Sequence, residues 1–248
     1  MFVLVWLRFP LQYWIGLVAV TVATLGTVAI WEGGRWPLGL FVPLRVLVPE
    51  LGRGLLWGAV LVGSCAALVV LSTDVRHEPG RGFPWLELLT VFVPAALHEE
   101  LLFRGYPFQK LLRWNRIVAL LLLALVFAAL HSGNTAVNVL GLVNIFLGGI
   151  LLGLAYERYA RLWFPFGIHL AWNLMTGPIL GHEVSGYFGE STLFVERGAG
   201  PLWLTGGEFG IEGSIWMTLV EIIAISTIVR ISWRRPMLSA TPEKESNP

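Results

Sequence analysis

Long apolar runs recur along the whole chain and are separated by short segments that carry most of the charged residues. About 20 apolar residues are needed to cross a bilayer, because its hydrocarbon core is ~30 Å thick and a helix rises ~1.5 Å per residue. This rule predicts seven membrane-spanning helices, of which the fourth is short, at about 12–30, 55–72, 85–108, 117–131, 137–156, 163–180 and 214–232. The pattern therefore predicts an all-α fold, a polytopic transmembrane helix bundle.

Two stretches do not have the pattern of a simple span. Residues 36–50 are apolar but contain Pro37, Pro43 and Pro49, so this stretch either lies in the interface, re-enters the membrane or adds an eighth element. Residues 181–213 form the longest polar stretch and are rich in glycine, which favours turns. We expect about seven to eight spans and an ordered cap on the non-cytoplasmic side.

The composition agrees with a membrane protein. Of the 248 residues, 56% are hydrophobic and only 13% are charged, whereas soluble domains have about 25% charged residues. We expect a single bundle over residues 1–235 with a motif-bearing core at about 85–180, and a polar, disordered tail at 236–248. The lipid bilayer is the expected partner, and a net charge of +1 gives no reason to expect nucleic acid.

Lys and Arg are distributed unevenly between the predicted loops. One side of the bundle has twelve of the seventeen basic residues, the other side has four, and Arg104 lies within a span. Cytoplasmic loops are enriched in Lys and Arg. The asymmetry therefore predicts a multi-pass membrane protein with a cytoplasmic C-terminus, and the short loops and compact size favour a bacterial cell membrane.

The segment LHEELLFRGYPFQ, residues 97–109, places charged groups deep in a predicted span. A charge at the membrane centre costs about 2.5–3.5 kcal/mol on insertion scales, so such groups need internal partners. Glu100 and Arg104 are four residues apart and share a helix face on which they can pair. Glu99 is rotated by roughly 100° from Glu100. It is left free to face the bundle interior, where it suits a general base.

Two more predicted spans carry polar side chains. FAALHSGN places Phe127 and His131 one helical turn apart, and PFGIHLAWNLMTG places His169 and Asn173 four residues apart on one face. Ionisable groups within a membrane normally face one another rather than lipid. We therefore expect these side chains to converge with Glu99 in one polar pocket.

Such a pocket has the groups needed to hydrolyse an amide. A carboxylate and a histidine can hold and deprotonate a water molecule, and a His and an Asn can donate hydrogen bonds to the oxygen of an attacked carbonyl. No candidate Ser or Cys nucleophile lies next to these groups, and this favours water as the nucleophile. A zinc site is the competing interpretation. Glu99, His131 and His169 are three candidate ligands for zinc, although the HExxH spacing is missing.

EELLFR, FAALH and HLAWN match, in this order, the motifs EExxxR, FxxxH and HxxxN. Together they resemble the CPBP family of intramembrane proteases, which includes the type II CAAX prenyl endopeptidases and the bacterial Abi and bacteriocin-immunity proteins. The motifs cover residues 99–173, about a third of the chain. The stretch LTGGEFGIEGS is also similar to one in bacterial members, without an assigned role.

The resemblance implies a CAAX-protease-like endopeptidase that cleaves a membrane-associated peptide or small membrane-protein substrate without a metal cofactor. It implies that Glu99 is the general base, that His131 helps to hold the water, and that His169 and Asn173 form the oxyanion site. It also implies supporting roles for three residues, Glu100 and Arg104 behind Glu99, and Phe127 beside the pocket.

Two other functions are compatible with the pattern. One is a non-catalytic membrane protein that binds a peptide, as immunity proteins do. The other is a proton or solute carrier, which is disfavoured because the chain lacks the internal repeat that many transporters show.

Overall fold

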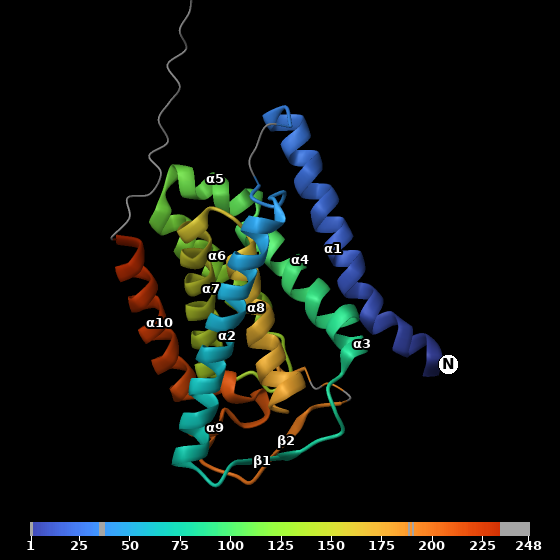
Figure 1. Ribbon diagram of the computed structural model, residues 1–248, viewed down its shortest axis with the longest axis vertical. Helices are drawn as coiled ribbons and strands as arrows, with labels where there is room; N and C mark the ends of the chain where they lie inside the picture. Colours follow the sequence, from blue (N-terminus) through green and yellow to red (C-terminus); the bar gives the residue numbers. More distant parts are fainter. Residues whose placement is uncertain (1, 35–37, 188, 190, 234–248) are drawn as a thin grey trace, which may run out of the picture.

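The computed structural model describes residues 2–34, 38–187, 189 and 191–233, and most of these residues are helical (Figure 1). The predicted tail at 236–248 lies outside this range. One group of helices forms a bundle: α2 (Leu44–Ser72), α6 (Arg116–His131), α7 (Val139–Tyr159), α8 (Trp163–Leu174) and α10 (Ile215–Trp233). The long helix α1 (Phe2–Glu32) lies at the side of this bundle, where its main contacts are with α4 (Val93–Arg104).

The predicted span 85–108 is wrong at its C-terminal end. A short helix α3 (Trp85–Glu87), a π-helical turn η1 (Leu88–Phe92) and α4 follow one another, and the chain then breaks at Gly105. A Cβ atom at Gly105 would lie 2.0 Å from the carbonyl oxygen of Leu101, so a larger residue does not fit. The next helix, α5 (Tyr106–Trp114), is amphipathic, which is typical of a helix at the membrane surface.

The proline-containing stretch 36–50 does not form a separate element in the part of the chain that the structure describes. Helix α2 begins at Leu44, directly after Pro43, and continues through Pro49 to Ser72. Residues 44–50 are therefore the first turns of a 29-residue helix. Residues 35–37 lie outside the described residues.

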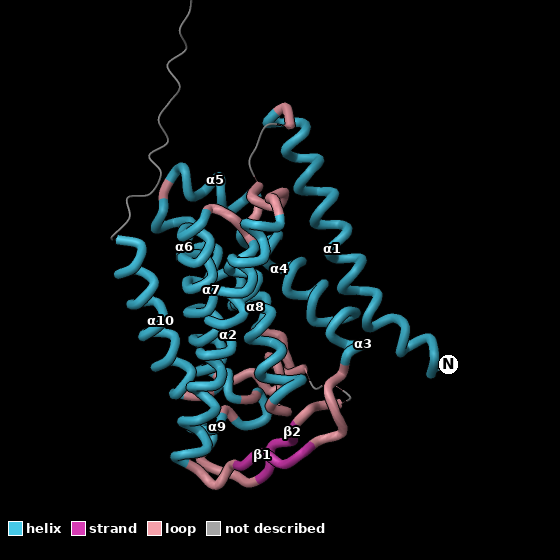
Figure 2. The backbone as a smooth tube through the Cα atoms, viewed as in Figure 1, coloured by secondary structure: helices cyan, strands magenta, loops and turns pink. Residues whose placement is uncertain are grey.

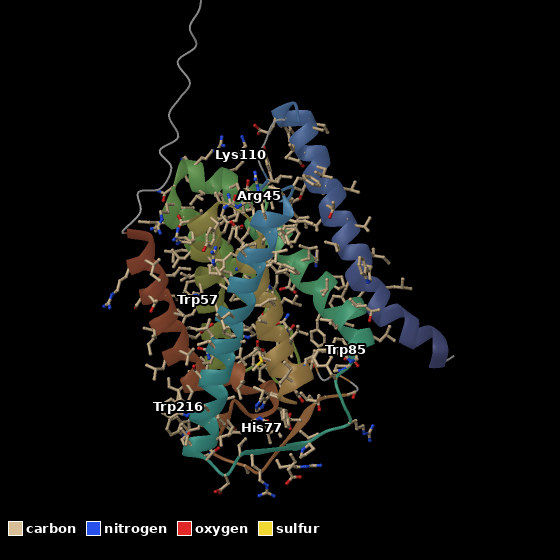
Figure 3. All side chains as sticks on the ribbon, in the orientation of Figure 1. Arg45, Trp57, His77, Trp85, Lys110 and Trp216 are labelled. Carbon is tan, nitrogen blue, oxygen red and sulfur yellow. The ribbon has the colours of Figure 1, made fainter. Side chains whose placement is uncertain are left out.

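Three helical segments are long and apolar enough to cross a membrane by length and composition, namely Leu11–Glu32, Leu44–Ser72 and Val139–Tyr159, and the apolar helix α6 is shorter. The count of seven to eight spans stays a prediction. Exposed tryptophans lie near both ends of the bundle. Trp85 lies near the cap (Figure 3), and Trp114 is the last residue of α5. This distribution is typical of the two interfaces of a bilayer.

Helices α2 and α8 pack closely because glycine lines their contact. A Cβ atom at Gly54 would lie 2.3 Å from the carbonyl oxygen of Phe164, and one at Gly58 would lie 2.4 Å from that of Ile168. On α8, Gly167 faces the backbone of α2 in the same way. Small residues at four-residue spacing let membrane helices approach backbone to backbone. We call this contact the glycine seam; it fixes the height and rotation of α8.

The described residues of the polar stretch 181–213 form, with the α2–α3 loop, a cap at the end of the bundle opposite α5 (Figure 2). Strand β1 (Arg76–Pro79) pairs antiparallel with β2 (Phe194–Arg197), so the all-α expectation was incomplete. Short helical pieces follow at α9 (Leu202–Thr205), η3 (Gly207–Phe209) and η4 (Ile211–Gly213). The α5 end carries Arg45 and Lys110, whereas His77 lies in the cap (Figure 3).

Candidate active site

Four predicted site residues line one cavity of about 390 Å³. Glu99 comes from α4, His131 from the last residue of α6, and His169 and Asn173 from successive turns of α8. His131 and His169 lie at the same level of the bundle because α6 ends beside the second half of α8. Helix α8 then continues as the π-helical turn η2 (Met175–Ile179). The structure therefore brings together side chains from three helices.

Glu99 faces this cavity with a carboxylate that retains solvent access. Its side chain is 26% exposed, and its Oε2 lies 3.7 Å from Nε2 of His169. This distance is too long for a direct hydrogen bond. Glu99 is thus placed to interact with a molecule in the cavity. The preceding residue, His98, points instead towards Gly16 of α1.

Glu100 is fully buried and joins two partners with one oxygen. Its Oε1 accepts hydrogen bonds from Nη1 of Arg104 at 3.1 Å and from Nδ1 of His169 at 2.8 Å. The expected Glu100–Arg104 pair is confirmed. Glu100 also contacts His169 on another helix, and the supporting role of Glu100 and Arg104 for Glu99 stays a prediction.

Arg104 connects three helices at this point. Its Nη2 donates to the carbonyl oxygen of Gly149 on α7 at 3.1 Å, and its guanidinium carbon lies 5.2 Å from the ring centroid of Phe127 on α6. The side chain is almost fully buried. Arg104 therefore compensates the charge of Glu100 and also satisfies a backbone group.

The Glu100 contact determines what His169 can do. A carboxylate only accepts hydrogen bonds, so Nδ1 of His169 carries the proton of this contact. Its other ring nitrogen, Nε2, lies on the side of Glu99.

His131 is oriented by its own helix. Its Nδ1 lies 2.8 Å from the carbonyl oxygen of Phe127, which accepts a hydrogen bond and thereby assigns the proton to Nδ1. The neutral ring then has a lone pair on Nε2. Phe127 packs beside both histidines, with ring centroids 4.5 Å from His131 and 6.3 Å from His169. Phe127 thus holds the position beside the pocket that the motif suggested.

Several residues of this site were not among the predicted ones. Glu212, in the stretch LTGGEFGIEGS, is buried and accepts hydrogen bonds from Nε1 of Trp172 and from the backbone and hydroxyl of Ser185. It ties the cap to α8 next to Asn173. Tyr13 of α1 also lines the cavity. The glycine-rich stretch was a visible signal for Glu212, whereas nothing in the sequence pattern pointed to Tyr13.

A preformed metal cluster is not seen in the described part of the chain, where no three His, Cys, Asp or Glu side chains are placed together to hold a metal ion. Both histidines of the cavity use Nδ1 in hydrogen bonds to protein groups, which leaves Nε2 as the ring nitrogen that a metal could bind. Zinc with Glu99, His131 and His169 as ligands stays a prediction.

Residues 81–175 match the sequence model of a family described as "type II CAAX prenyl endopeptidase Rce1-like". This segment of the chain is similar to that family. All three motifs lie inside the matched segment, so the resemblance to the CPBP proteases is confirmed. The family is one of membrane CAAX-type proteases, and the apolar helices of the chain agree with a membrane protein.

An "Uncharacterized 24.3 kDa protein" of Escherichia coli is 36% identical over 118 residues, which are 46% of this chain and 54% of that protein. The chain thus spans about half the length of this curated relative. No solved structure matches the chain.

Proposed function

We propose that this protein is a membrane-embedded endopeptidase in which Glu99 activates a water molecule for attack on a peptide bond. The observation that carries the proposal is the convergence of Glu99, His131, His169 and Asn173 on one cavity. The similarity to the Rce1-like family supports the same reaction class. Polar groups of this kind are costly inside a membrane and normally serve a function.

The first step is the attack of water. In this scheme the water donates one hydrogen bond to the Glu99 carboxylate and the other to Nε2 of His131. Glu99 takes a proton as the water oxygen bonds to the carbonyl carbon. Proton transfer of this type contributes about 10²–10⁴-fold to the rate. When the C–N bond breaks, the proton passes from Glu99 to the leaving amine.

The second requirement is a site for the negative charge that develops on the carbonyl oxygen. The Asn173 amide and the Nε2–H of the His169 imidazolium are the donors that we assign to this role. Glu100 stabilises the imidazolium through Nδ1, and Arg104 holds Glu100 in place. These two residues are therefore positioning residues for His169.

The proposed substrate is a peptide or small membrane protein in the bilayer. The cavity is lined by residues 184–187 of the cap and by the C-terminal end of α6, so it lies towards the cap end of the bundle. The basic residues at the α5 end favour a multi-pass arrangement in a bacterial membrane with that end, and the C-terminus, in the cytoplasm. Cleavage would then take place towards the non-cytoplasmic side.

The test is peptide cleavage by the purified protein in lipid nanodiscs, with CAAX-like and unbiased peptide pools and with or without EDTA. Glu99→Gln removes the base, and Glu78→Gln is the matched control because Glu78 pairs with Arg76 at the surface of the cap. We expect cleavage by the wild type and by Glu78→Gln, loss in Glu99→Gln, and no effect of EDTA.

Other outcomes point to different functions. Cleavage that EDTA abolishes and Zn²⁺ restores would favour the zinc-dependent alternative. Full activity of Glu99→Gln would refute the assigned base. Peptide binding without cleavage in every sample would favour the peptide-binding alternative of the immunity-protein type.

A further inference from the structure

A second, smaller cavity of about 60 Å³ adjoins the candidate active site. The two cavities share His131, His169, Asn173 and Ser185 in their walls. The small cavity continues between α7, α8 and α10, and ends among residues that play no part in the proposed reaction. It therefore lies next to the position of the proposed scissile bond.

One wall of the small cavity carries a carboxylate that lacks a hydrogen-bond partner within the described part of the chain. Glu221 of α10 is 0% exposed, and neither Oε1 nor Oε2 has a partner. It faces α7 at Gly148, where a Cβ atom would lie 3.2 Å from its Oε1. An isolated buried carboxylate is costly as an anion, so it either holds a proton or binds a cation that compensates its charge.

The charge around the cavities favours the binding of a cation. The two cavities are lined by three carboxylates, those of Glu99, Glu212 and Glu221. Among the described lining residues there is no Lys or Arg. Arg104 is committed to Glu100. Glu212 is satisfied by three donors from Trp172 and Ser185. Glu221 is thus the carboxylate left to bind a cation from outside.

The size of the cavity indicates which cation fits. A volume of 60 Å³ is several times the ~10–15 Å³ that one water molecule needs, so a small cationic head group fits. The ammonium of a lysine is a compact point charge that a single carboxylate can bind, whereas the planar guanidinium of an arginine is larger and suits a bidentate partner. Leu151, Leu152 and Ile168 supply an apolar wall for the methylenes.

We infer that the small cavity is a specificity pocket in which Glu221 binds the ammonium group of a substrate lysine next to the scissile bond. The substrate class is therefore a membrane-associated peptide with a lysine at the cleavage site. This inference rests on the proposed endopeptidase function for its catalytic consequence, but the binding of a primary ammonium group is independent of catalysis.

The first experiment compares peptides that differ only in Lys, Arg or norleucine at each position around the cleavage site, with products located by mass spectrometry. A hydrogen bond to a charged group contributes enough for a discrimination of 10-fold or more. We expect the wild type to show at least this preference, in kcat/KM, for Lys over norleucine and over Arg. In Glu221→Gln the Lys-to-norleucine ratio should fall at least 10-fold.

The matched control is Glu50→Gln, because Glu50 is buried and charged but pairs with Arg161 outside both cavities. It should keep the wild-type ratio even where it lowers stability. Equal cleavage of Lys and norleucine peptides by the wild type, or a ratio that Glu221→Gln leaves unchanged, would overturn the inference.

The second experiment separates the pocket from the reaction. n-Butylammonium, which reproduces a lysine side chain, is added to Glu99→Gln protein, with n-butanol as the neutral comparison. We expect a saturable rise in Tm with n-butylammonium only, and its loss in the Glu99→Gln/Glu221→Gln double variant. If no protein cleaves any peptide, this result still supports the pocket, whereas the absence of a Glu221-dependent Tm shift overturns it.

Discussion

The replacement of Arg104 by alanine is the sharpest test of how the buried charges are held. Arg104 and Glu100 have side-chain exposures of 3% and 0%, so water screens their attraction little. The variant removes the cation and leaves the carbonyl oxygen of Gly149 without its donor. Breaking a buried pair from one side costs about 3–5 kcal/mol. His169 still contacts Glu100, so we expect a loss near the lower limit, about 3 kcal/mol.

The measurement is reversible unfolding in mixed detergent micelles, followed by circular dichroism, for the wild type, Arg104→Ala, Glu100→Gln and the double variant. Gln at position 100 can still accept the hydrogen bond from His169, so the double-mutant cycle isolates the charge interaction. We expect the double variant to be more stable than the sum of the two single losses implies.

The pair Arg116–Glu157 is the control for this cycle. Its Arg side chain is 45% exposed, and exposed pairs couple by only about 0.2–1 kcal/mol. An Arg104→Ala protein within about 1 kcal/mol of the wild type, or additive losses at positions 100 and 104, would refute the assigned role of the buried pair.

Three further predictions concern the oxyanion site, the glycine seam and the cap. Asn173→Ala should lower kcat by about 10²-fold or more, which is the effect of losing one oxyanion donor, with little change in Tm. Unchanged turnover would remove Asn173 from this role. Gly58→Ala should destabilise the protein by about 1–3 kcal/mol because α8 must move away. Gly63→Ala on the same helix meets nothing within 4 Å and should be neutral or stabilising, so equal effects of the two would contradict the seam. Burial, and then the neighbouring His182, lower the pKa of His77, so its neutral form stabilises the cap. This contribution is present above the ordinary pKa of about 6.5 and is lost as the pH falls through the lowered value. Tm should therefore drop between about pH 7 and pH 5, and the drop should be smaller in His77→Gln; parallel pH profiles would contradict this assignment.

The sequence predicted the positions of the helices well because each needs an apolar run of a certain length. It did not predict the break at Gly105, because Phe103, Tyr106 and Phe108 extend the apolar pattern past it and glycine and proline are both frequent within membrane helices. It also did not predict the strands β1 and β2. Each has four residues, and each depends on a partner more than 100 residues away.

Within the candidate site, the spacing of residues along the sequence was sufficient to predict contacts inside one helix, such as that of Glu100 with Arg104. Contacts between helices depend on how the helices are rotated against one another, which no spacing rule specifies. The bond between Glu100 and His169 spans 69 positions of the chain and was therefore not predicted. Glu221 was not predicted either, because a single carboxylate in an apolar run belongs to no motif.

The glycine seam has a mechanical consequence for the membrane. Helices α2 and α8 touch through their backbones, so no side-chain rotamers can adjust this contact when the bilayer becomes thinner or thicker. Helix α1, whose main contacts are with α4 and η1, can tilt at a lower energetic cost. We expect lipid composition to move Tyr13 on the outer wall of the cavity while His169 keeps its place, so that lipids tune the entry of substrate rather than the chemistry.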